Sequence, residues 1–168
     1  MTGRRTGRAL LASGLLLTLL ITGCGVRPSG VITGRPAVSG PSSRGVVVLY
    51  LLAQGELMLT LRPAKVDPSP AEALALLSAG PDENERGNGF TSEVPAGFVP
   101  VKVAPGVDRA GLTVTTSGAA QPLSANAVDQ IVCTVADAAA RADLVGSFVP
   151  VTIVGPDGAR QPRRCPLQ

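Results

Sequence analysis

The stretch GVVVLYLLAQGELMLTL, residues 45–61, decides the fold class. Gly45 to Ala53 is a continuous apolar run of strand length, and Glu56 to Leu61 has leucine at every second position. A continuous run indicates a buried strand, whereas alternation indicates a strand with one buried face. Only Gln54 and Gly55 separate the two, which predicts a tight turn. The sequence therefore predicts a domain that begins with a β-hairpin at Gly45.

The segment after this hairpin has the signals of a helix, predicted within Asp67 to Pro81. Ser69 is placed to be the N-cap, Pro70 to occupy the first helical position and Glu72 to complete a capping box. Gly80, followed by proline, ends the pattern because neither residue favours continuation of a helix.

Two more strands, a second helix and a last strand follow. The strands are predicted at Phe98 to Val103 and Gly111 to Thr116, and the helix from Ser124 to about Asp143. The last strand is Phe148 to Val154, followed by a turn at Pro156-Asp157-Gly158 and a short return that ends at Cys165. The order β-β-α-β-β-α-β predicts an α+β fold with one mixed or antiparallel sheet and two helices on one face.

The N-terminal segment has the pattern of an export signal. Met1 to Arg8 carries three arginines and no acid, and Ala9 to Ile21 is an apolar run. A helix of that length spans about 20 Å, which is less than the hydrocarbon core of about 30 Å. An export signal is therefore expected instead of a membrane span. The pair Arg4-Arg5 leaves the twin-arginine route open beside the general one.

The residues that follow resemble the lipobox of bacterial lipoproteins. Ile21 lies at position −3, small residues lie at −2 and −1, and Cys24 lies at +1. The resemblance implies a signal peptide of residues 1–23 and a diacylglycerol on Cys24, which anchors the chain to the outer face of the cell membrane. An ordinary signal peptide with a chance cysteine is the alternative. Residues 24–44 hold the anchor and a Gly/Pro/Ser-rich tether, and residues 45–168 form the domain.

The composition removes several classes of function. Histidine is absent, and with it the commonest general base and metal ligand. Twelve acids and twelve of the fifteen basic residues follow Cys24, so the mature part is neutral. A neutral body with 2% aromatic residues lacks the charge and stacking surfaces of a nucleic-acid binder. No enzyme activity, cofactor or metal is expected.

The stretch AEALALLSAGPDENERGNGFTSEVPAG, residues 71–97, resembles the signature of GerMN domains, the sporulation and spore-germination module. In that signature a helix ending in Leu-Leu-x-Gly-Pro leads through a charged loop to a Leu/Phe-Thr-Ser-x-x-Pro-x-Gly turn; in this chain two residues, Ser78 and Ala79, separate Leu77 from Gly80, one more than the signature has. The matching residues are Leu76, Leu77, Gly80, Pro81, Phe90, Thr91, Ser92, Pro95 and Gly97. The resemblance covers about residues 46–154 and is similar in layout to short actinobacterial lipoproteins. It implies an exported, membrane-attached protein that supports envelope assemblies, and it brings no catalytic residues.

Two cysteines remain after lipidation, Cys133 in the second predicted helix and Cys165 after the last strand. Paired thiols outside the cytosol are oxidised, so a disulfide between them is expected. The alternative is a buried Cys133 that packs as a small hydrophobe and a free Cys165. A metal site is not expected with two cysteines and no histidine.

The acidic run of residues 82–93 has a chance likeness to a calcium loop. Asp82, Asn84, Gly87 and Glu93 fall on the EF-hand spacing, but Arg86 stands where a ligand oxygen is required. A solvated loop with a turn at Asn88-Gly89 is expected instead.

Catalysis by other groups also lacks support in the sequence. Asp82, Glu83 and Glu85 adjoin one another, whereas a glycosidase needs two carboxyls that face each other across a cleft. Lys65 and Lys102 are the two lysines, and neither belongs to a nucleophile motif.

The sequence thus favours a membrane-anchored lipoprotein whose GerMN-like module binds or scaffolds another envelope component, an unidentified protein. The alternative is a carrier or sensor that holds a small apolar molecule in a pocket between helix and sheet. An open apolar pocket would favour the carrier, and an exposed apolar patch or sheet edge would favour protein binding.

Overall fold

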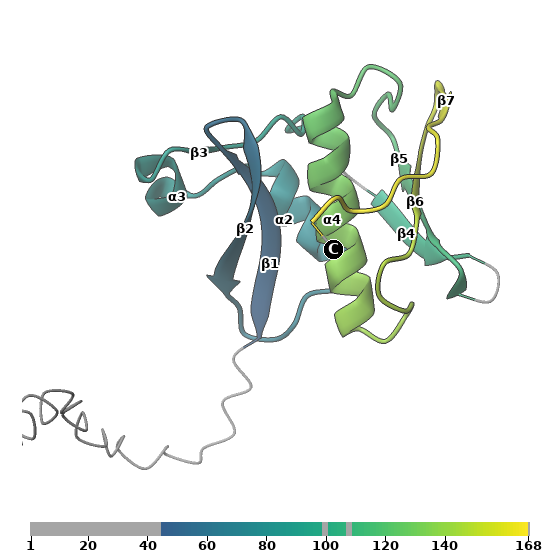
Figure 1. Ribbon diagram of the computed structural model, residues 1–168, viewed down its shortest axis with the longest axis horizontal. Coiled ribbons are helices and arrows are strands. Elements are labelled where there is room, and N and C mark those ends of the chain that lie inside the picture. The colour runs from purple at the N-terminus through teal and green to yellow at the C-terminus, as the bar shows by residue number, and fades with distance from the viewer. Residues whose placement is uncertain (1–44, 99–100, 107–108, 168) are drawn as a thin grey trace, which may run out of the picture. The chain divides into compact units, whose positions relative to one another are not determined.

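The computed structural model describes residues 45–98, 101–106 and 109–167, which belong to one compact unit of the chain. The predicted signal peptide, Cys24 and the tether lie outside these residues. The elements are β1 (Val46–Ala53), β2 (Glu56–Pro63), α2 (Pro70–Ser78), α3 (Glu83–Gly87), β3 (Phe90–Thr91), β4 (Val101–Pro105), β5 (Leu112–Thr116), α4 (Ala125–Arg141), β6 (Val151–Gly155) and β7 (Gly158–Ala159) (Figure 1).

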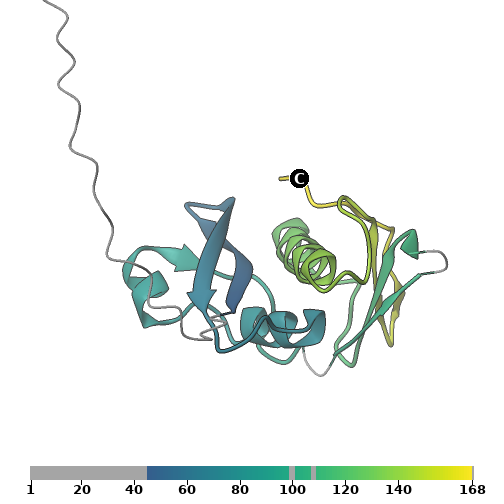
Figure 2. The same cartoon turned by 90° about the horizontal axis from the view of Figure 1, so that it is seen from below.

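The strands form two sheets. The first has the antiparallel order β2-β1-β3, and the second has the order β4-β5-β6-β7. Strands β5 and β6 are parallel, while the other pairs of the second sheet are antiparallel. The α+β class is confirmed. The prediction of one sheet with two helices on one face is wrong, because α4 lies between the two sheets (Figures 1 and 2).

Side chains of α4 occupy part of the β1 edge that faces away from β2, next to the short pairing of β1 with β3. The main-chain N–H of Tyr50 donates to Thr134 Oγ1 at 3.1 Å, and Gln130 Nε2 donates to the Tyr50 carbonyl at 3.0 Å. Both α4 residues are fully buried. Their hydrogen bonds satisfy the groups that a neighbouring strand would otherwise satisfy, so the sheet does not continue past this point.

Helix α4 also connects the parallel strands β5 and β6. Parallel neighbours need a crossover connection, which is usually a helix. The helix can pack between the two sheets because most of its residues are buried. These include Val128, Ile131, Val132 and Val135. In the part of the chain that the structure describes, no helix is long and apolar enough to cross a membrane.

The local signals of the hairpin and of α2 are confirmed. Gln54 and Gly55 form the turn of the hairpin, with φ angles of 53° and 85°. Such positive φ values at both central residues are typical of a tight hairpin turn. Ser69 caps α2 by accepting from the Glu72 N–H, and the Glu72 side chain accepts from Ser69 in return.

Two predicted strands begin later than expected. For the strand predicted from Phe98, β4 is Val101–Pro105, and Phe98 itself belongs to a turn in which its N–H donates to the Pro95 carbonyl; residues 99 and 100 lie outside the described ranges. The strand predicted from Phe148 starts at Val151. Phe148 has a φ of 64°, which is outside the range of a strand.

Candidate functional site

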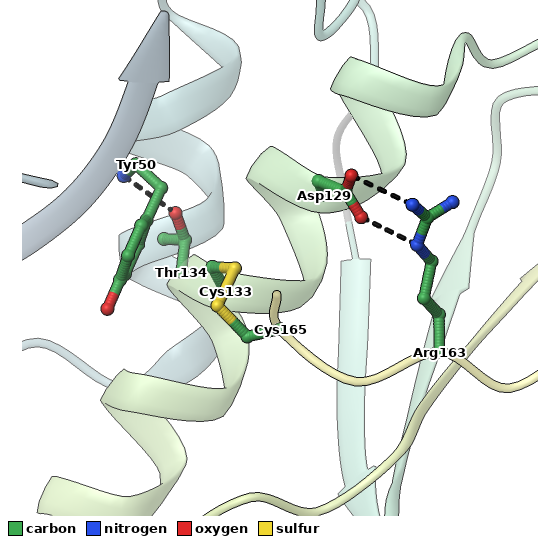
Figure 3. The surroundings of a disulfide bond; sticks show 6 residues. All are labelled: Tyr50, Asp129, Cys133, Thr134, Arg163 and Cys165. Atoms are coloured by element: carbon green, nitrogen blue, oxygen red, sulfur yellow. Dashed lines mark hydrogen bonds and ion pairs between the residues drawn. A yellow bond between two sulfur atoms is a disulfide. The ribbon is translucent and has the colours of Figure 1, made fainter. Parts of the chain in front are cut away.

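The structure joins Cys133 and Cys165 in a disulfide (Figure 3). Cys133 projects from the middle of α4, and Cys165 belongs to the extended segment after β7. The two Cα atoms are 4.7 Å apart, and both residues are buried. The bond therefore fixes the C-terminal segment against the central helix.

An ion pair one helical turn from the disulfide holds the same segment. Arg163 Nε lies 2.7 Å from Asp129 Oδ1, and Arg163 Nη2 donates to Asp129 Oδ2 at 3.0 Å (Figure 3). Burial raises the pKa of Asp129, and the nearby Arg163 opposes this rise. The main chain of Arg163 exchanges two hydrogen bonds with Val151 of β6. The C-terminal segment is thus held by β6 and by α4, which indicates a structural role.

The second half of the signature stretch, residues 90–97, connects β1 to α4. Thr91 pairs with Leu52 of β1 in β3. The main-chain N–H of Glu93 donates to Gln130 Oε1 at 2.9 Å, so the Gln130 amide bridges this stretch and β1. The Glu93 carboxylate accepts from Ser124 and Asn126 at the start of α4, and these hydrogen bonds hold its pKa below the usual value.

Most of residues 82–93 are exposed, as the sequence predicted, but the stretch is not a loop throughout. It contains the short helix α3, which Asp82 caps, and the turn at Asn88-Gly89 follows it. The Glu85 carboxylate is buried and accepts from Arg62 Nε at 2.9 Å and from Arg62 Nη2. Arg62 Nη2 also donates to the Gly80 carbonyl at 2.9 Å. Arg62, which comes from β2, thus neutralises the buried acid of α3.

This pairing predicts a pH dependence of stability. Hydrogen bonds from Arg62 hold the pKa of Glu85 below its usual value of 4.5, so ionised Glu85 stabilises the fold above that pH. The contribution is lost as the pH falls through the lowered pKa. We expect Glu85→Gln to reduce the fall in unfolding free energy between about pH 6 and about pH 3, measured by urea titration. Glu83→Gln, at an exposed position of the same helix, is the control; equal slopes in all three proteins would contradict the assignment.

The carboxylates on the calcium spacing do not converge. Asp82 caps α3 and lies 3.7 Å from Arg62, whereas Glu93 binds the start of α4. Among residues 45–98, 101–106 and 109–167, no group of three His, Cys, Asp or Glu side chains is placed to hold a metal ion. Asp82 and Glu93 instead serve separate contacts within the fold.

Strand β2 leaves one long edge of the first sheet open. Because Ala53 and Glu56 are opposite each other across the turn, strand alternation directs the main chain of Leu57, Leu59 and Leu61 away from β1. No strand of the described ranges pairs with that edge. The side chains of Leu59 and Leu61 are 48% and 62% exposed.

An apolar groove lies where the chain leaves β2 and enters α2. Its volume is about 380 Å³, and its lining comprises Val47, Ala64, Lys65, Val66, Pro68, Glu72, Ala75 and Leu76. Val66 is 69% exposed and Leu76 is 37% exposed. The groove is therefore an open surface feature and not an enclosed cavity.

The sequence signals for this surface were incomplete. The leucine alternation of Glu56 to Leu61 predicted a strand with one buried face. The strand is confirmed, but its leucine face is not buried, because Leu59 and Leu61 lie on an edge strand. Pro63, at the end of β2, is the one signal of an edge position, because proline is confined to edges and strand ends. The groove has no signal within any single segment, since its walls come from two elements.

Comparison of the chain with protein-family models, with curated proteins and with solved structures finds no match.

Proposed function

We propose that this protein is a lipoprotein anchored through Cys24 to the extracytoplasmic face of the cell membrane, with a non-catalytic GerMN-like module that binds or scaffolds cell-envelope proteins. The lipobox supports the anchor, and the signature at residues 71–97 supports the family and its envelope or sporulation role. The disulfide is consistent with an oxidising compartment.

One observation carries the docking role. Seven large hydrophobic side chains are exposed in the described part of the chain, and five of them lie on β2, just after it or on α2. These five, here called the β2–α2 surface, are Met58, Leu59, Leu61, Val66 and Leu76. Val66 and Leu76 line the apolar groove, and Leu59 and Leu61 share one face of the β2 edge, whereas Met58 lies on the other face of that strand. Exposed apolar side chains in such neighbouring positions are typical of protein interaction sites.

The lipid anchor would keep the docking surface near the membrane, where its partner proteins lie. The described chain begins at Gly45, whose carbonyl accepts from the Ala64 N–H beside the groove. A Gly/Pro/Ser-rich tether of about twenty residues would reach roughly 25 Å, so the anchor would keep the β2–α2 surface close to other envelope proteins.

The proposal is tested in intact cells with a photoreactive residue at Val66. We expect illumination to produce adducts with envelope proteins, and we expect Cys24→Ala to remove both the adducts and the protein from the membrane fraction. Leu167 is the matched control position, since it is 54% exposed but lies outside the β2–α2 surface. Equal adducts at both positions, or membrane retention of Cys24→Ala without a diacylated N-terminus in the wild type, would contradict the proposal.

The apolar groove favours a second candidate, a carrier or sensor of a small apolar molecule. Sites for small ligands usually bury 70–90% or more of the ligand's surface, which requires a closed pocket. Since Val66 and Leu76 remain so exposed, the groove suits an apolar side chain of a partner better than a free ligand. A bound apolar molecule in native mass spectra of the purified protein would favour the carrier.

A further inference from the structure

We propose that the connection between α4 and β6 contacts the outer surface of the lipid bilayer, with the Phe148 side chain inserted at the boundary between headgroups and acyl chains. The partner of this surface is lipid and not protein. The inference rests on the lipid anchor of the proposed function and adds an orientation to it, in which one end of the domain faces the membrane.

Phe148 differs from the other aromatic residues of the chain. The sequence has three phenylalanines, one tyrosine and no tryptophan. The other three aromatic residues are buried or packed against the hydrophobic core; they are Tyr50, Phe90 and Phe98. Phe148 is 54% exposed, although Val145 and Val149 of the same connection are core residues. The connection is therefore fixed to the core while its one aromatic side chain lies in solvent.

The main chain of Phe148 is held in an unfavourable conformation. Its φ is 64°, in the left-handed region that bulky residues seldom adopt. Such conformations persist only where the surrounding contacts impose them, and they are common at ligand-binding sites. Here the Arg164 guanidinium donates to the Phe148 carbonyl, and the next residue, Cys165, is bonded to α4. The C-terminal segment thus holds Phe148 in place as an exposed residue.

The α4–β6 connection lies at the end of the domain where the described chain begins. Thr91 pairs with Leu52 near the end of β1. Two residues later, Glu93 accepts hydrogen bonds from Ser124 and Asn126 at the start of α4. Helix α4 and strand β1 therefore run in opposite directions (Figure 1). Both are about 26 Å long, so the connection that follows α4 is at the same end as the first residues of β1.

The lipid anchor supplies the partner of this end. Cys24 is 21 residues before Gly45 in the sequence, and a tether of this composition spans about 25 Å on average. Because the tether joins the domain at the end that carries the α4–β6 connection, this end is the nearest to the bilayer. Two acyl chains hold the domain there, so a contact too weak to bind a free protein is still populated. Burial of one phenylalanine side chain favours the contact by about ten-fold or more.

The charged side chains around the connection are balanced. Arg141 forms an ion pair with Asp137 at 2.7 Å, and Arg164 and Asp143 carry opposite charges. The contact therefore depends on insertion of an apolar side chain, and we expect it to form on a bilayer of phosphatidylcholine without anionic lipid.

Single tryptophans test the contact in the lipidated chain, because the sequence contains none. Phe148→Trp places one in the connection. Met58→Trp is the matched control, since Met58 is 47% exposed and pairs with Leu51, in the half of β1 farther from Gly45. Each variant is reconstituted in phosphatidylcholine vesicles whose acyl chains carry bromine near the headgroup, a quencher that acts at contact. Interfacial side chains enter the headgroup and acyl boundary by about 5–10 Å, so we expect about two-fold quenching in Phe148→Trp and little change in Met58→Trp.

Hydroxyl-radical footprinting of the wild-type chain on the same vesicles makes the test independent of substitution. Phe148 and Met58 are exposed to similar degrees in the domain itself, so both would react if neither contacted lipid. We expect Phe148 to be protected and Met58 to be oxidised, each relative to the same peptide of the chain unfolded in urea.

Three outcomes would overturn the inference. Equal quenching in both tryptophan variants would mean that the domain has no preferred orientation on the bilayer. Retention on the vesicles without quenching in Phe148→Trp, or oxidation of Phe148 in the wild type, would mean that the connection stays in water; the anchor would then stand without this contact. Loss of both variants from the vesicles would reject the anchor and this inference together, whereas failure of the Val66 adducts alone would reject the docking role and not the membrane contact.

Discussion

Gln130→Leu is expected to lower the free energy of unfolding by about 2 to 5 kcal/mol. The Gln130 side chain is fully buried in α4, accepts from the Glu93 N–H and donates to the Tyr50 carbonyl. Leucine has a similar size but neither a donor nor an acceptor, so the buried Tyr50 carbonyl and the partly buried Glu93 N–H both lose the Gln130 amide as a partner. Each buried group left unpaired costs about 1 to 3 kcal/mol. Urea unfolding with the disulfide intact measures the change.

Gln121→Leu is the matched control, because the exposed Gln121 amide makes one hydrogen bond, to the Ala159 carbonyl at 3.1 Å. We expect this substitution to change the unfolding free energy by less than about 1 kcal/mol. If both substitutions had equal effects, the amide of Gln130 would not be the link between β1, the signature stretch and α4. Thr134→Val, which removes the partner of the Tyr50 N–H, is expected to fall between the two.

The second large effect concerns the disulfide. Replacing Cys133 and Cys165 together by alanine is expected to cost about 3 to 4 kcal/mol, since the bond closes a loop with a sequence separation of 32. The C-terminal segment would then be held by the Asp129–Arg163 pair and by the hydrogen bonds to Val151. Thermal or urea unfolding measures the loss, and trypsin should cleave faster at Arg163 in the variant.

Peptide mapping without reduction is the direct check on the bond. Peptides that contain Cys133 and Cys165 should be recovered joined from the wild-type protein. Two alkylatable thiols in the folded protein, or an unchanged unfolding midpoint in the alanine variant, would show that packing alone holds the C-terminal segment.

Features whose causes are local could be predicted from the sequence. The hairpin turn at Gln54-Gly55 and the capping box of Ser69 and Glu72 depend on residues at most three positions apart, and both are confirmed. The α+β class followed from the succession of strand and helix periodicities. Such signals are complete within a short stretch, because the interacting residues are neighbours in the chain.

Features that depend on distant partners could not be predicted. The place of α4 between the two sheets depends on contacts such as the hydrogen bond from the Tyr50 N–H to Thr134, residues that are 84 positions apart. The burial of Glu85 follows from Arg62, which lies 23 positions before it. An acidic run is usually solvated. Nothing within residues 82–93 shows that Glu85 forms hydrogen bonds with the guanidinium of Arg62 from β2.

The candidate surface is intermediate between these two cases. The leucine alternation of β2 could be read from the sequence, but its edge position could not, because the neighbours of a strand are set by the whole topology. The cysteines were paired by compartment chemistry instead of spacing, since with two thiols left only one intramolecular pairing exists. The lipid anchor at Cys24 stays a prediction.

The place of α4 beside β1 determines the order in which the chain can mature. Tyr50 is synthesised 80 residues before Gln130 and 84 before Thr134, whose side chains form hydrogen bonds with its main chain. Contacts so distant along the chain are formed slowly, because a long loop must close first. Until α4 packs against β1, both edges of the N-terminal hairpin lack part of their hydrogen-bond partners. The β2 edge still lacks a partner strand in the described structure. The hydrogen bonds of β1 are therefore complete only after α4, the last helix of the domain, has been synthesised and has packed against it.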